Sequence, residues 1–329
     1  QAATWTVVKG EATRFPIPVE TLRRRRAGWH PDAEASLADV RRRIVATPAV
    51  VERVAPEAPG SRWIVGSAPC VSAARALVGP SGYRGRTGVF TGGANAVYYL
   101  EPAAGQATAT TGWFSNVTRG AKRAAPSVRV ELETELIHEV VRGRDLARWH
   151  ARSGAQLLCP HTPASRRWAL PPDELERRYP KAWSYLRRMR PVLDRRRGFT
   201  AWERSVREEA FYALQRIGDY TFAPHKVAWR YVADDFVVAV VGPDERGRPR
   251  LPNDKVMFVG LEDPREAHFL CALLSCDPVR WKVVAYAAKT QISASAIDAR
   301  TYALSLSVPF GAADGERELR LVSAQDRAG

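Results

Sequence analysis

The residues from Gly88 to Asn95 read GVFTGGAN, a glycine-rich segment that also carries polar side chains. Paired glycines let a backbone approach a ligand closely, and exposed backbone amides bind phosphate. Thr91 and Asn95 add hydrogen-bond donors and acceptors that suit phosphate oxygens or base edges. A tight β-turn without a ligand explains the same glycines, and the segment alone favours this simpler interpretation.

A second polar block reads RGRDLARW from Arg142 to Trp149. A guanidinium group can form two parallel hydrogen bonds with a phosphate or with O6 and N7 of guanine, so Arg142 and Arg144 are candidate DNA contacts. For Arg144, an ion pair with Asp145 that closes a turn is an equally good interpretation.

Acidic residues raise a different possibility, magnesium-dependent cleavage of DNA. Such a site needs a carboxylate cluster with a lysine. The nearest approach combines Asp244 with the sequence NDK, in which Asp254 stands one position too close to Lys255. A divergent magnesium nuclease therefore remains an alternative, and it requires Asp234, Asp244 and Asp254 to converge in space.

The charge of the chain favours a polyanionic partner. The 329 residues carry a formal net charge of +15, although 43 of the 50 basic residues are arginine, a skew that GC-rich coding also produces. The net excess of positive charge still favours nucleic acid. A non-enzymatic nucleic-acid-binding scaffold is a further alternative, because Tyr98, Tyr99, Trp229 and Tyr231 would suit base stacking on an open sheet, although core packing is the more ordinary role for them.

Composition also indicates the compartment. Four cysteines are too few for a dense disulfide framework and fit a reducing cytoplasm. No apolar run approaches the roughly 18 residues that span a bilayer, and the first residues lack a secretory signal, so we expect no membrane partner.

The hydrophobic pattern predicts an α+β fold, a mixed β-sheet with flanking helices that follows an N-terminal basic connector. In chain order we expect a helical connector over 1–60, strands over 61–170, helices over 172–215, strands over 225–260 and helices from 264 onward. The 101–127 stretch reads as a long loop or an irregular hairpin.

Two basic runs lie in the connector, Arg23–Arg26 and Arg41–Arg43. Asp32 is a plausible N-cap for a helix from Ala33 to Val45, which would carry the second run. Such runs are usually solvated faces, and phosphate contacts are the alternative.

Several short sequence motifs, in their residues and in their order along the chain, resemble the C-terminal target-recognition domain of TaqI-like, adenine-specific DNA methyltransferases, including enzymes that fuse nuclease and methylase. The blocks are GVFTGGANAVYY, RGRDLARW, YPKAWSYLRRMRPVLDRRR from Tyr179, PHKV from Pro224, FLCALLSC from Phe269, and the segment from Ile297 to Pro309. This chain departs from the family's pattern by one extra residue at Gly93-Ala94 and by the inserted His225.

The resemblance implies a connector over 1–60, a DNA target-recognition domain over 61–310 and a tail over 311–329. It also implies sequence-specific binding of double-stranded DNA in prokaryotic defence. The expected contacts are Arg86, Thr91, Asn95, Lys122, Arg123, Arg142, Arg144, Arg166, Arg167, Lys226, Lys289 and Gln291.

The catalytic machinery of that family is missing from these residues. The glycine-rich turn lacks the following helix that seats S-adenosylmethionine, and the prolines of Leu170–Asp173 have the wrong flanks for the loop that binds a flipped adenine. We therefore expect no cofactor in this chain and no enzyme activity from it alone. Its partners would be DNA and a catalytic methyltransferase domain that binds S-adenosylmethionine.

Overall fold

The structure, a computed structural model, describes residues 8–286 except 55, 57–60, 62, 78–80, 166, 198 and 234. The predicted tail over 311–329 and the segment 287–310 therefore lie outside the described residues. The α+β class is confirmed, since helices alternate with antiparallel and mixed sheets. No helix among the described residues is long and apolar enough to span a bilayer.

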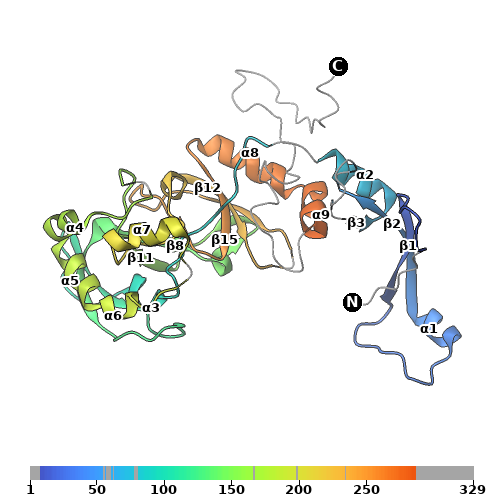
Figure 1. The fold of residues 1–329 in the computed structure, drawn as a ribbon, viewed down its shortest axis with the longest axis horizontal. Helices are drawn as coiled ribbons and strands as arrows, with labels where there is room; N and C mark the ends of the chain where they lie inside the picture. Colours follow the sequence, from blue (N-terminus) through green and yellow to red (C-terminus); the bar gives the residue numbers. More distant parts are fainter. Residues whose placement is uncertain are drawn as a thin grey trace, which may run out of the picture.

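A three-stranded antiparallel sheet forms the N-terminal part. Its strands are β1 (Ile17–Arg24), β2 (Ile44–Arg53) and β3 (Trp63–Gly66), and two helices accompany them, α1 (Leu37–Arg43) and α2 (Ala68–Ala76). Figure 1 shows the β1–β2 hairpin extending away from the body of the molecule, with α1 near its tip.

This hairpin differs from the helical connector that the sequence predicts. The helix begins after Ser36, whose hydroxyl accepts the Asp39 amide at 3.2 Å, and it ends at Arg43. The chain then becomes a strand because Ile44 and the residues after it pair with β1, Arg24 opposite Ile44. The unit also continues past residue 60 into β3 and α2.

Two six-stranded sheets form the body. The first sheet has the order β4 (Arg86–Thr87), β15 (Val256–Leu261), β12 (His225–Arg230), β13 (Val238–Val241), β10 (Trp149–Ala151), β9 (Leu146–Ala147). The second has the order β14 (Leu251–Pro252), β8 (Ile137–Val141), β11 (Ala155–Leu158), β5 (Tyr99–Pro102), β6 (Thr111–Asn116), β7 (Arg129–Glu133). Each sheet contains one parallel pair, β10 with β13 and β14 with β8, so both are mixed.

Helices cover each sheet and enclose a core. The second sheet packs with α4 (Pro172–Arg178), α5 (Pro180–Arg188), α6 (Arg190–Leu193) and α7 (Ala201–Glu209), and the first with α8 (Pro264–Ser275) and α9 (Asp277–Tyr286) (Figure 1). Leu100, Leu132 and Leu186 are fully buried in one core, and Trp229 and Leu274 in the other. Burial of each such side chain stabilises the fold by about 2 kcal/mol.

Local signals explain where these elements begin and end. Helix α5 ends at Arg188, and Pro191 lies in the first turn of α6, where its missing N–H removes no intrahelical hydrogen bond. Of the two expectations for the stretch 101–127, the hairpin is confirmed, because β6 lies within it and pairs antiparallel with β5. Residues Asn95–Tyr98 form one helical turn, α3, before β5, within the stretch 61–170 that the sequence predicts as strands.

Candidate nucleic-acid interface

The glycine-rich segment and the Tyr179–Arg197 segment, which stand far apart in the sequence, are in direct contact. The Tyr185 hydroxyl donates to the Val97 carbonyl at 2.7 Å, and the Arg196 guanidinium lies 5.7 Å from the centre of the Tyr98 ring. The two segments therefore form one buried junction.

A chain of tyrosine hydroxyls extends this junction to two further loops. Tyr98 donates to the Tyr212 carbonyl at 2.7 Å, and Tyr212 donates to the Leu170 carbonyl at 2.6 Å. With the bond from Tyr185, these contacts constitute a tyrosine relay that fixes four segments to one another. All three rings are almost completely buried, so water competes poorly for these bonds.

The GVFTGGAN turn is closed by its own residues. Gly92 and Gly93 have φ values of +68° and +84°, which favour glycine. The Thr91 hydroxyl donates to Asn95 Oδ1 at 2.5 Å, and Thr91 is only 3% exposed. The predicted DNA contact at Thr91 is therefore wrong, because its hydroxyl is buried and engaged, whereas Asn95 is exposed.

The space above this turn is filled by the chain. A Cβ atom at Gly92 would lie 3.0 Å from the Arg196 side chain and 3.0 Å from Gln215 Nε2. Arg196 is buried and donates to the carbonyls of Ala213 at 2.7 Å and Leu193 at 3.2 Å. The side chains of Arg196 and Gln215 therefore pack directly against the turn.

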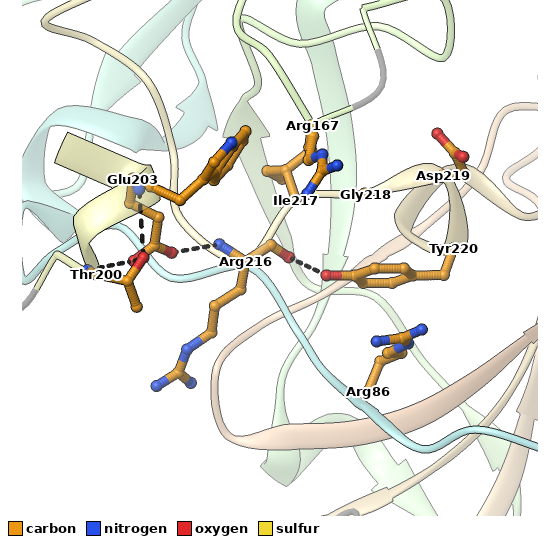
Figure 2. Close-up of a pocket in the computed structure, with 10 residues that line it drawn as sticks. Arg86, Arg167, Thr200, Glu203, Arg216, Ile217, Gly218, Asp219 and Tyr220 are labelled. Atoms are coloured by element: carbon orange, nitrogen blue, oxygen red, sulfur yellow. Dashed lines mark hydrogen bonds between the residues drawn. The ribbon is translucent and has the colours of Figure 1, made fainter. Parts of the chain in front are cut away.

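Beside the junction lies a hollow of about 640 Å³, which we call the arginine–aromatic pocket (Figure 2). Its lining consists of Arg86, Arg167, Thr200, Trp202, Glu203, Arg216, Ile217, Gly218, Asp219 and Tyr220. Strand β4, the loop before α4, helix α7 and the segment after α7 each contribute to it. It includes two of the predicted DNA contacts, Arg86 and Arg167.

Each arginine of the pocket lies over an aromatic ring. The Cζ atom of Arg86 is 4.7 Å from the centre of the Tyr220 ring, and that of Arg167 is 4.9 Å from the Trp202 ring. Arg216 lies 5.2 Å from the Phe90 ring. Stacking on a ring holds the guanidinium plane while its edge can still donate to an anion.

Arg216 is one of two residues other than glycine with positive φ among the described residues, with φ of +60°. Four hydrogen bonds hold this part of the chain. The Arg216 N–H donates to Glu203 Oε1 at 3.2 Å, and its carbonyl accepts the Tyr220 hydroxyl at 3.3 Å (Figure 2). Gln215 before it exchanges two backbone bonds with Phe90, at 2.9 Å and 3.1 Å. Such conformations gather at functional sites. No sequence motif marks a left-handed arginine, so the place of Arg216 in this pocket could not be predicted from the sequence.

The carboxylates of the pocket do not neutralise it. Glu203 forms the capping box of α7, in which its Oε2 accepts the Thr200 amide at 2.9 Å and the Thr200 hydroxyl at 3.0 Å. Asp219 is the second acidic residue in the lining. Three guanidinium groups thus face two carboxylates, and the pocket retains a positive charge.

Other predicted contacts lie outside this pocket. Lys122 and Arg144 are exposed, and Arg123 is half-buried beside Gly93, where a Cβ would lie 3.3 Å from Arg123 Nε. Arg142 differs from the expectation. It forms a two-bond ion pair with Asp145, at 2.8 Å and 3.0 Å, that closes the turn, so Arg142 rather than Arg144 has the structural role.

Lys226, one of the predicted DNA contacts, does not face solvent. It is fully buried on β12, and its ammonium group donates to the Ala223 carbonyl. Burial lowers the pKa of Lys226 to about 7. The remaining predicted contacts, Arg166, Lys289 and Gln291, lie outside the described residues.

The geometry gives little support to the two alternatives. Asp244 accepts the amides of Arg246 and Arg248 at 2.9 Å and 2.8 Å, and Asp254 pairs with Lys255, while Asp234 is outside the described residues. Within the part of the chain that the structure describes, no group of three His, Cys, Asp or Glu could hold a metal ion.

The rings proposed for base stacking differ in exposure. Tyr98 and Trp229 are completely buried, so they cannot stack on a nucleobase. Tyr99 and Tyr231 are half-buried. The ordinary role, core packing, thus holds for the first two.

A second cationic hollow, of about 530 Å³, lies at the tip of the N-terminal hairpin. Its lining consists of Arg25, Arg26, Ala27, Gly28, Trp29, Arg42 and Arg43. Arg43 lies 5.5 Å from the centre of the Trp29 ring. Both predicted basic runs therefore meet here, next to an aromatic side chain.

The cationic hollows and the turn at Gly92 are described from the residues of this chain alone, because comparison with known proteins identifies no relative. No protein-family model matches the chain, and no curated protein matches it either.

Proposed function

We propose that this chain binds double-stranded DNA as the target-recognition part of an adenine-specific DNA methyltransferase or restriction–modification protein. The catalytic domain, with its S-adenosylmethionine, would lie outside these residues, and the chain alone would not be an enzyme. The observation that carries the proposal is the arginine–aromatic pocket, in which Arg86, Arg167 and Arg216 surround one hollow. The resemblance of the sequence blocks supplies the methyltransferase context.

The physical argument is electrostatic. Guanidinium groups on aromatic supports are less hydrated than ammonium groups and match phosphate oxygens in pairs. A net charge of +15 attracts DNA over a longer range. Phosphate contacts position a protein on the duplex, and exposed polar groups such as Asn95 and Arg144 would then read base edges.

Binding of the chain to mixed-sequence duplex DNA across a salt series tests this proposal. The test variants are Arg86→Gln, Arg167→Gln and Arg216→Asn, since asparagine tolerates the left-handed conformation. We expect the slope of log affinity against log salt to become shallower by about 0.9 for each phosphate contact removed.

The matched control is Arg178→Gln on α4. Arg178 is also an exposed arginine, but it is bound to Glu174 at 2.7 Å and lies 3.6 Å from Glu135. It should leave the salt slope unchanged. An unchanged slope in the triple pocket variant would exclude the pocket as the DNA contact.

Target recognition requires a second measurement. Selection of bound duplexes from a random pool should enrich one sequence if the chain recognises a target. Recovery of an unbiased pool, with normal salt dependence, would contradict the target-recognition role and leave only non-specific DNA binding.

A further inference from the structure

Trp149 has an unusual combination of exposure and backbone conformation. It is 65% exposed, more than any other large apolar side chain among the described residues. Its φ is +74°, and it is the second non-glycine residue with positive φ beside Arg216 of the pocket. It sits at the tip of the tight turn between β9 and β10, in which Ala147 pairs with His150.

Neither property benefits the fold. The third position of such a turn favours glycine or asparagine, because a Cβ atom is strained at positive φ. A tryptophan ring in water also gains no burial energy. Because both the positive φ and the exposed ring are unfavourable for the fold, Trp149 points to a role in binding a partner.

The surroundings hold the strained turn in place. Trp149 pairs with Ala239 of β13, and the Arg152 amide donates to the Asp145 carbonyl at 3.0 Å. The Arg142–Asp145 ion pair closes the preceding turn. The ring is therefore presented from a rigid base, which reduces the entropy lost on binding.

Exposed arginines lie near Trp149 in the chain. Arg144, Arg148 and Arg152 are all exposed, and Arg148 Cζ lies 5.9 Å from the centre of the Trp149 ring. Asp145 is engaged by Arg142, and Asp235 forms its shorter contact with Arg280, at 2.8 Å, and a longer one with Arg148, at 3.7 Å. The excess of positive charge around Trp149 therefore suits a polyanionic partner better than a protein surface with few acidic residues.

We propose that Trp149 is a wedge that stacks against a nucleobase of the bound duplex, with Arg148 on an adjacent phosphate. This inference rests on the proposed DNA binding and names a residue that contacts a base. Sheet order places β10 four strands from β4, the strand of Arg86, which is about 19 Å. One turn of duplex, about 34 Å long, is therefore long enough to reach both Trp149 and the pocket.

The experiment compares Trp149→Asn and Trp149→Tyr with the unchanged chain on two DNA probes. One probe is a short mixed-sequence duplex, and the other is the same duplex with a one-nucleotide bulge. A wedge binds the bulged duplex more tightly because its bases are already partly unstacked. Trp149→Asn should weaken duplex binding about 10-fold, leave the salt slope unchanged and abolish the preference for the bulge.

Melting temperatures of these variants and one control variant separate stacking from folding. Asparagine tolerates positive φ, so the melting temperature of Trp149→Asn should stay the same or rise, whereas Trp149→Tyr should keep most of the affinity. Val232→Asn, at another exposed apolar residue that is 52% exposed, is the control and should bind as the unchanged chain does.

The outcomes distinguish the two proposals. If the unchanged chain binds DNA with steep salt dependence but Trp149→Asn binds equally well and keeps the bulge preference, the wedge is refuted and DNA binding stands. If the unchanged chain does not bind duplex DNA at low salt, both proposals fail.

Discussion

His161 makes a sharp prediction about stability and pH. It is 1% exposed in the loop before α4. Its Nδ1 lies 2.9 Å from the Trp168 carbonyl, and its Nε2 accepts the Leu214 amide at 2.9 Å. The ring must therefore be neutral with its hydrogen on Nδ1, because a proton on Nε2 would face the N–H of Leu214. Burial lowers the pKa of His161 to about 3.

The sign and size of the effect follow from this pKa. Above pH about 6.5 the ring is neutral in both states and its contribution is complete. As pH falls below that value the unfolded chain binds a proton that the folded chain refuses, so stability is lost at about 1.4 kcal/mol per pH unit until the folded pKa is reached. The loss attributable to His161 is about 2 kcal/mol at pH about 5.

Urea unfolding from pH about 7.5 to about 4.5 measures this slope in the unchanged chain and in His161→Asn. The amide of asparagine can donate in place of Nδ1 but leaves the Leu214 amide unpaired, so the variant should be less stable at neutral pH by about 1–3 kcal/mol. Its stability should then fall less steeply with acid. His138, whose pKa burial lowers to about 4, contributes equally to both proteins and cancels in the difference.

The matched control is His268→Asn at an exposed position on α8. If the unchanged chain and His161→Asn lose stability in parallel as the pH falls, the buried neutral histidine does not control acid stability and the reasoning is refuted.

Two other predictions concern buried backbone and buried charge. Gly88→Ala should lower the free energy of unfolding by about 3 kcal/mol, and with it the melting temperature, because its Cβ would overlap the carbonyl oxygens of Pro252 and Asn253. Gly82→Ala is the control, since its Cβ would meet open space and its stability should hardly change. Lys226 has a folded pKa of about 7 against 10.5 unfolded, so the stability of the unchanged chain should rise between those pH values. Lys226→Met should be more stable at neutral pH and should lack this rise in urea unfolding, and a rise that persists in the variant would contradict the assignment.

Local sequence signals predicted much of the fold. Apolar and β-branched residues predict strands over 225–260, and prolines mark the starts of α5 and α8, so these elements could be predicted from their own residues. The N-terminal hairpin was mispredicted because the helix expected from Ala33 to Val45 includes Ile44 and Val45, whereas these residues begin a strand that depends on β1, a partner distant in the sequence. Hydrogen-bond partners of this kind cannot be read from a short window.

The candidate site divides in the same way. Arg86 and Arg167 are among the expected DNA contacts, and both line one pocket. Lys226 was misplaced because β12 is covered on both faces, so its side chain enters a core although the residue type favours the surface. Arg216 and Trp149 were missed as site residues because their distinguishing feature is a positive φ, which tertiary contacts impose.

The tyrosine relay has a consequence for how a new specificity could arise. Each hydroxyl donates to a backbone carbonyl of another segment, so the bonds survive changes of side chain at the acceptors Val97 and Leu170, but not shifts of the backbone there or at Tyr212, whose own hydroxyl is also a donor. If one segment were replaced by a segment from another protein, its backbone carbonyl would move. A buried tyrosine hydroxyl would then be left without a hydrogen-bond partner. Exchange by recombination should therefore succeed for the whole block from residue 88 to 217 and fail for single loops within it.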